Sequence, residues 1–200
     1  MNVRGGDRLD ILVVCMGNIC RSPFAEVLLT DAARRYGPGT PVRVRSAGIR
    51  GLGGHAAMPE MQAEATSRGL DLSRHVARGI DPARLVEPDL VLAMTAAQRD
   101  HLTQVAPAAA SRTFTLRELA ALAEEIDPPE EAGTPGEHLR EVAARADRAR
   151  RDRPGTRRDR DVDDPYGAGR AVYARIAQEI EDAVRRLAPV LFGGHGPSSG

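Results

Sequence analysis

The sequence has few of the residues that identify a disulfide-stabilised protein or a metal site. It has only two cysteines in 200 residues, Cys15 and Cys20, and both lie in one short segment. A disulfide framework is therefore not expected, and we predict a cytoplasmic protein in a reducing compartment. No spacing of histidine and cysteine is typical of a zinc site, so we expect no bound metal.

An excess of one charge and long hydrophobic runs are also missing. All 28 basic residues are arginine, and they balance 28 acidic residues, which gives no general attraction to nucleic acid. No apolar run approaches the ~20 residues that cross a bilayer, and residues 1–8 lack a signal-peptide pattern. We expect no nucleic-acid or membrane partner, and a monomer with one domain over residues 1–192 and a disordered tail at 193–200.

The most informative segment runs from a hydrophobic strand into a helix. The apolar run Leu9–Val14 predicts a buried parallel strand, and Pro23 suits the first turn of the helix that follows. Between them, Gly17 and Asn18 tolerate the unusual backbone angles of a tight loop. The N–H groups of such a loop can converge on one anion at the positive end of the helix dipole. We therefore predict a phosphate-binding loop directly after the first strand.

Cys15 and Arg21 stand at the two ends of this loop. A thiol that faces converging N–H groups is favoured as the nucleophilic thiolate, and a planar guanidinium grips two oxygens of a phosphoryl group. Because arginine is frequent in this chain, the spacing alone is weak evidence, and Cys15 could instead be a small buried residue that ends a strand. The glycine-asparagine turn, the serine after Arg21 and the helix start favour a reactive site.

Strands and helices alternate along most of the chain. This order predicts a single-domain α/β fold with an open four-stranded parallel sheet, helices on both faces and ligands at the carboxyl ends of the strands. Further strands are expected at Val42–Ala47, Asp89–Met94 and Arg112–Thr115, and further helices at Pro59–Ser67, Thr95–Ala106, Leu116–Ile126 and Tyr166–Leu187. The segment 127–162, rich in proline and charge, has only a weak helical patch near Leu139–Ala146. We interpret it as an exposed, flexible and partly disordered insertion.

Hydrolysis of an aryl phosphate also needs a proton for the departing oxygen. Asp164 lies with Asp163 directly before Pro165 and the last predicted helix, and proline favours an extended approach of the residue before it. Asp164 can therefore be presented at the mouth of the site as a general acid. The alternative is that this aspartate only caps the helix.

Taken together, these residues resemble the low molecular weight protein tyrosine phosphatase family, in its bacterial form. The matching motifs are Cys15-x-Gly-Asn-x-Cys-Arg-Ser-Pro23, Ser46-Ala-Gly48, Ser73-x-His-x-Ala-Arg78, the strand Asp89–Met94 and the later Asp164-Pro-Tyr166. The resemblance covers about Asp10–Ile126 and Val162–Leu187 and leaves out the insertion. It implies a phosphatase without cofactor that acts on phosphotyrosine in proteins.

The resemblance also implies a role for each residue of the loop. Cys15 would attack phosphorus, Arg21 and the loop amides would hold the phosphoryl oxygens, and Asp164 would protonate the leaving phenol. Water would then hydrolyse the phosphocysteine intermediate with Asp164 as base, while the Ser22 hydroxyl stabilises the departing thiolate. The other residues implied to contact the substrate are Met16, Gly17, Asn18, Ile19, Cys20, Leu52 and Tyr166.

Supporting roles are implied around the loop. Asn18 is implied to hydrogen-bond toward Ser46, and His75 to join the same network, although a histidine in a polar turn can equally be satisfied locally. Cys20 resembles the family's second loop cysteine, which can form a disulfide with the nucleophile; simple packing is the alternative.

The substrate interpretation depends on the loop and on the pocket wall. Family members that act on phosphoarginine are expected to carry threonine in place of Ile19, so phosphotyrosine is favoured, with a protein arginine phosphatase as the alternative. Leu52 replaces the aromatic residue of eukaryotic-type members and resembles bacterial members that act on tyrosine kinases and exopolysaccharide-assembly proteins, the implied partners. An arsenate reductase would need cysteines after Cys20, and a noncatalytic binding module would be expected to lose Cys15 or Asp164, so both are disfavoured.

Overall fold

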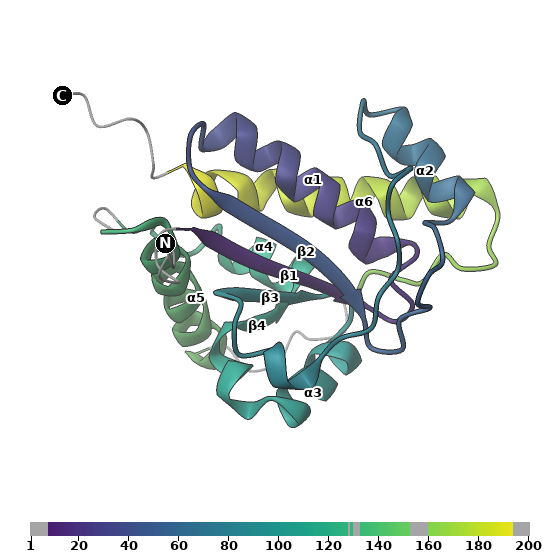
Figure 1. The fold of residues 1–200 in the computed structure, drawn as a ribbon. Helices are drawn as coiled ribbons and strands as arrows, with labels where there is room; N and C mark the ends of the chain where they lie inside the picture. Colours follow the sequence, from purple (N-terminus) through teal and green to yellow (C-terminus); the bar gives the residue numbers. More distant parts are fainter. Residues whose placement is uncertain (1–7, 128, 130–132, 153–159, 194–200) are drawn as a thin grey trace, which may run out of the picture.

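A four-stranded parallel sheet in the order β2-β1-β3-β4 forms the centre of the molecule, with helices on both faces (Figure 1). The computed structural model describes residues 8–127, 129, 133–152 and 160–193. The strands are β1 (Leu9–Cys15), β2 (Val42–Gly48), β3 (Leu90–Ala93) and β4 (Thr113–Thr115). The helices are α1 (Arg21–Tyr36), α2 (Pro59–Thr66), η1 (Pro82–Arg84), α3 (Ala96–Val105), η2 (Pro107–Arg112), α4 (Leu116–Leu122), α5 (Pro135–Asp152) and α6 (Arg170–Phe192). The predicted fold class is confirmed.

Strand β1 lies between β2 and β3 and is buried along its whole length. This burial explains its almost continuous apolar sequence, since both faces of a parallel strand are covered. The register places Cys15 beside Gly48 of β2 and Val14 beside Ala93 of β3. The carboxyl ends of three strands therefore meet where the loop after Cys15 begins, which is where ligands bind in such sheets.

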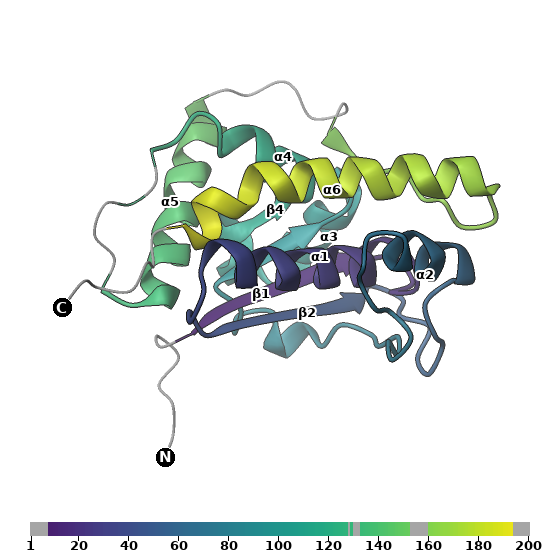
Figure 2. The ribbon, with the colours of Figure 1, turned by 90° about the horizontal axis from the view of Figure 1, so that it is seen from above.

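The two faces of the sheet hold separate hydrophobic clusters. Ile11 and Val13 belong to the larger cluster, which lies under α1 and α6, two helices that run side by side (Figure 2). Leu12 and Val14 point to the other face and pack with Leu102 of α3. The alternation of side chains along β1 thus divides the core in two. Among the described helices, none is long and apolar enough to span a membrane.

Helix α5 corrects the interpretation of residues 127–162 as an exposed insertion. Leu139, Val142, Ala143 and Ala146 of α5 are at most 2% exposed and belong to the larger cluster. Their spacing places them on one helix face, and the weak patch expected near Leu139–Ala146 is the buried stripe of an 18-residue helix. Residues 128, 130–132 and 153–159 of this segment, and the tail at 194–200, lie outside the described residues.

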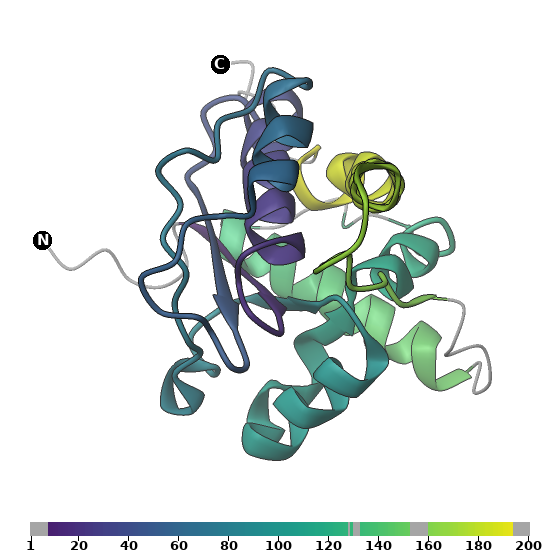
Figure 3. The same ribbon diagram turned by 90° about the vertical axis from the view of Figure 1, so that its right-hand side faces the viewer.

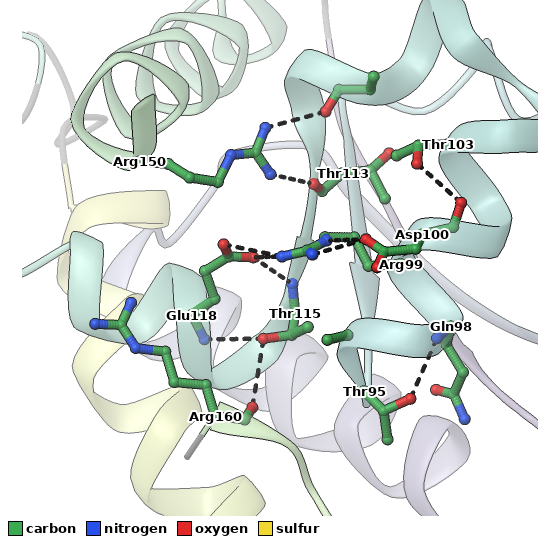
Figure 4. Close-up of polar contacts among 12 residues, drawn as sticks. Thr95, Gln98, Arg99, Asp100, Thr103, Thr113, Thr115, Glu118, Arg150 and Arg160 are labelled. Carbon is green, nitrogen blue, oxygen red and sulfur yellow. Dashed lines mark hydrogen bonds and ion pairs between the residues drawn. The ribbon is translucent and has the colours of Figure 1, made fainter. Parts of the chain in front are cut away.

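Arg150 fastens α5 to the edge strand β4 (Figure 4). Its guanidinium donates hydrogen bonds to the carbonyl oxygens of Thr113 at 2.9 Å and Ala110 at 3.3 Å. It also lies 4.5 Å from the centre of the Phe114 ring, within the range of a cation–π contact. Arg150 is one of the charged residues that favoured an exposed segment in the sequence, yet it attaches α5 to the sheet.

A buried ion pair joins the helices on either side of β4. Arg99 of α3 and Glu118 of α4 lie 3.1 Å apart, and both side chains are less than 10% exposed (Figure 4). Glu118 also completes a capping box with Thr115, which begins α4. Thr115 Oγ1 donates to the carbonyl oxygen of Arg160 at 3.4 Å. The start of α4 therefore also contacts the segment that leads to Asp164.

Candidate active site

The loop after β1 is seen near the centre of Figure 3, and its residues surround the thiol of Cys15. The backbone N–H of Asn18 donates to Cys15 Sγ at 3.3 Å, and Ser22 Oγ lies 3.0 Å from the same sulfur. Cys15 is 2% exposed. The Asn18 N–H and the Ser22 hydroxyl are thus placed to hydrogen-bond to the sulfur, as the nucleophile of a phosphate-binding loop requires.

Asn18 stabilises the conformation of the loop through hydrogen bonds of its side chain. Its φ of 57° is the one positive value outside glycine in the described chain. The side-chain amide donates to Ser22 Oγ at 2.9 Å and Ser46 Oγ at 2.8 Å, and its oxygen accepts the N–H of Arg78 at 3.0 Å. His75 Nε2 lies 2.7 Å from the Asn18 carbonyl oxygen. The structure thus brings Asn18, Ser46 and His75 into one network, with the Asn18 side chain fully buried beneath the pocket.

Arg21 is buried at the start of α1 and contacts the segment before α6. Its Nη1 donates to the carbonyl oxygen of Val162 at 2.9 Å, and its Nη2 forms an ion pair with Asp164. Its Nε is buried without a hydrogen-bond partner among the described residues. A charged donor left open beside converging backbone N–H groups is suited to an oxyanion.

The segment that carries Asp164 is anchored at the carboxyl end of β3. The N–H of Val162 donates to the Met94 carbonyl oxygen at 2.8 Å. Asp161 Oδ1 accepts the N–H of Ala96 at 2.7 Å and so caps the first turn of α3. Asp161 carries no recognisable sequence motif, because its contact is with a helix that lies 65 residues away in the chain. Asp161 thus joins the segment that carries Asp164 to α3 and is not among the residues that line the pocket.

One open pocket of about 230 Å³ brings the two segments together. Its walls include the half-exposed side chain of Leu52 and the exposed ring of Tyr166. The lining residues are Cys15, Met16, Gly17, Ile19, Cys20, Arg21, Arg50, Leu52, Asp164 and Tyr166. Of the residues expected to contact the substrate, Asn18 and Ser22 are instead buried behind the pocket. Arg50 lines it and was missed, since a lone arginine in a glycine-rich stretch gave no signal.

Cys20 differs from Cys15 in its surroundings. Both thiols are free, and Cys20 Sγ lies 3.9 Å from the hydroxyl of Tyr173 on α6. Burial raises the pKa of the Cys20 thiol to about 12, so this sulfur is protonated at neutral pH. The thiolate form, which is the one that reacts, is therefore strongly disfavoured at Cys20.

The fold and the loop define the class of α/β proteins that carry a cysteine-containing loop, suited to an oxyanion, at the carboxyl end of the central strand. Residues 10–152 match the family described as low molecular weight phosphotyrosine protein phosphatase, and the chain belongs to this family. The family consists of protein-tyrosine phosphatases, which are hydrolases, and the predicted recognition and enzyme class are confirmed.

Several bacterial proteins are similar to this chain. The chain is 41% identical over 107 residues to the low molecular weight protein-tyrosine-phosphatase Ptp of Acinetobacter johnsonii, a match that covers 54% of this chain and 71% of that protein. Among solved structures, the arginine phosphatase YwlE from Geobacillus stearothermophilus is 27% identical with a TM-score of 0.64, covering 91% and 90% of the two chains. The tyrosine phosphatase Wzb from Escherichia coli K30, in complex with sulphate, is 25% identical with a TM-score of 0.62, covering 92% and 96%.

Proposed function

We propose that this protein hydrolyses phosphotyrosine in proteins through a phosphocysteine intermediate. The observation that carries the proposal is the single pocket shared by Cys15, Arg21 and Asp164. Asp164 lies 143 residues after Arg21 in the chain, yet the two side chains are in contact. A nucleophile, a cationic oxyanion holder and a proton donor are the parts that this reaction needs.

In the first step, Cys15 Sγ attacks phosphorus and the bond to the phenolic oxygen breaks. The loop N–H groups and Arg21 hold the phosphoryl oxygens, and the open Nε of Arg21 is one donor available for them. The incoming phosphoryl group competes with Asp164 for the guanidinium. In this mechanism Asp164 is the general acid that gives the departing oxygen its proton.

In the second step, water attacks the phosphorus of the phosphocysteine. Asp164, now ionised, takes a proton from this water as the P–S bond breaks. The sulfur leaves as a thiolate, and the Ser22 hydroxyl at 3.0 Å together with the Asn18 N–H at 3.3 Å stabilises its charge. Inorganic phosphate is released and the enzyme returns to its starting state.

The apolar walls of the pocket support an aromatic substrate. Ile19 lies in the loop itself, and Leu52 and Tyr166 stand at the pocket's sides. These side chains can pack against a phenyl ring, whereas none of the three carries a charge for a guanidinium. We therefore propose a phosphotyrosine protein as substrate, in particular a bacterial tyrosine kinase or a protein of exopolysaccharide assembly, as the resemblance of Leu52 to bacterial members of the family implies.

A protein arginine phosphatase is the second candidate function. The observation that favours it is the similarity in structure to YwlE, an arginine phosphatase, over about nine tenths of both chains. Asp164 at the pocket offers a carboxylate that a guanidinium could contact. The two candidates share the nucleophile and the loop and differ in the group that leaves.

The deciding experiment compares phosphate release from matched phosphotyrosine and phosphoarginine peptides, in the presence of EDTA. The wild-type protein is expected to prefer phosphotyrosine, Cys15→Ser to be inactive, and Asp164→Asn to be slower by about 10²- to 10⁴-fold. A preference for phosphoarginine would establish the second candidate. Binding of phosphate analogues without turnover of either peptide would contradict both and would leave only a binding module.

A further inference from the structure

Four arginines gather on the sheet at the end opposite the catalytic loop. Arg43 and Arg45 point from the edge strand β2 to the same face, because they lie two residues apart. Arg8, just before β1, and Arg84, the last residue of η1, are exposed beside them. We call Arg8, Arg43, Arg45 and Arg84 the arginine face.

Few carboxylates balance this charge. Arg43 and Arg45 both contact one buried residue, Asp10 of β1, and Arg84 contacts the exposed Glu87. Arg8 has no ion-pair partner among the described residues. The four guanidinium groups therefore form ion pairs with only two carboxylates, and a third, Asp89, lies close enough for the charge of Arg8 to act on it.

The contacts of Arg43 and Arg45 leave part of their hydrogen-bonding capacity unused. Within the described structure, the Nε atoms of both residues are buried without a partner. Burial, followed by the charges of Arg45 and Arg8, lowers the pKa of Arg43. Burial also lowers the pKa of Arg45; the charge of Glu87 opposes this shift, and the charges of Arg84 and Arg8 add to it. Each guanidinium thus lies in a field that an added anion would relieve.

The arginine face also lies within reach of the catalytic pocket. The five steps along β2 from Arg43 to Gly48 span about 17 Å, and Gly48 lies beside Cys15. Arg50 follows β2 and lines the pocket, so positive charge continues toward the site. A peptide in extended form covers about 3.3 Å per residue, so five to seven residues bridge this distance.

We infer that the arginine face binds an acidic segment of the protein substrate, about five to seven residues from its phosphotyrosine. The inference rests on the proposed function, since it names the class of protein that the same pocket would receive. A peptide is favoured over nucleic acid because the arginine face has no aromatic side chain on which bases could stack.

Two phosphotyrosine peptides test this inference, one with three glutamates at those positions and one with glutamines. The wild-type protein is expected to show a kcat/KM about fivefold higher for the glutamate peptide at low salt. The preference should vanish near 1 M salt, where the Debye length is about 3 Å. Arg8→Glu with Arg84→Glu should abolish it, because both residues are exposed and can change without disturbing the buried Asp10.

The matched control carries the same change of charge on α6, as Arg185→Glu with Arg186→Glu, and should keep the preference. All variants should hydrolyse p-nitrophenyl phosphate equally well. Equal kcat/KM for the two peptides in the wild-type protein would overturn the inference. So would a control variant that lost the preference for the glutamate peptide as fully as Arg8→Glu with Arg84→Glu.

Binding of the unphosphorylated glutamate peptide, followed by fluorescence anisotropy, separates this inference from the proposed function. Binding that needs Arg8 and Arg84 would support the arginine face even if phosphotyrosine were not hydrolysed. Tighter binding of a single-stranded oligonucleotide of equal charge would overturn the inference in favour of nucleic acid.

Discussion

Replacing Asn18 tests whether the catalytic loop is held by this one side chain. Its amide makes three hydrogen bonds at 2.8–3.0 Å, two of them buried, to Ser22 and Ser46, and one partly buried, to the backbone of Arg78. At about 0.5–1.5 kcal/mol for each bond, Asn18→Gly should lower the free energy of unfolding by about 2–4 kcal/mol. Asn18→Ala should cost about 1 kcal/mol more, because its Cβ disfavours a φ of 57°.

Urea unfolding at neutral pH measures both variants, and Ser46→Ala is the control that removes only one of the three bonds. The order of stability should be wild type, then Ser46→Ala, then Asn18→Gly, then Asn18→Ala. Activity toward p-nitrophenyl phosphate should fall in the same order for the two Asn18 variants, since the Asn18 N–H also contacts the nucleophile. The reasoning would be refuted if the free energy of unfolding of Asn18→Ala lay within about 0.5 kcal/mol of the wild-type value. It would also be refuted if Asn18→Ala were more stable than Asn18→Gly.

Three further changes probe the core, the acid segment and the second cysteine. Leu139→Ala should lower the free energy of unfolding by about 2–5 kcal/mol in urea, because this α5 residue is fully buried; a change like that of an exposed α5 residue would contradict α5 as part of the core. Asp161→Ala should cost about 0.5–2 kcal/mol through the lost α3 cap and should slow aryl phosphates with poor leaving groups more than those with good ones. An equal effect on both would mean that Asp161 does not position Asp164. Because burial raises the pKa of Cys20 to about 12, the unfolded chain releases this proton first, so the free energy of unfolding should fall between about pH 9 and 12. The difference from Cys20→Ala should show this slope, and a flat difference would contradict it.

The fold could be predicted from the sequence because its strongest signals are local. The apolar strand before Cys15 and the strand–helix alternation are enough to predict a parallel sheet. Helix α5 was misinterpreted because its average composition is charged, while its buried stripe takes up only a few positions. The final helix begins at Arg170 rather than Tyr166, since Gly167 with a φ of 78° turns the chain after Pro165.

The candidate site likewise contains residues that the sequence predicts and residues that it does not. Cys15, Arg21 and Asp164 stand in short motifs, and their side chains meet in one pocket as the motifs predict. Asp161 and Arg50 carry no motif, because their importance arises only from what the fold places beside them. Residues that hold or extend a site through contacts distant in sequence are therefore the ones that sequence reasoning misses.

The contact between Arg21 and Asp164 explains how loops from opposite ends of the chain can act as one site. Arg21 is fixed by the start of α1, and its guanidinium holds both the Val162 carbonyl oxygen and the Asp164 carboxylate. In the proposed mechanism, a phosphoryl group takes over the contact with Asp164 but leaves the one with Val162. The acid is thereby freed to donate a proton while its segment stays anchored to the residue that binds the phosphate. Substrate binding and protonation of the leaving group are thus coupled through a single side chain.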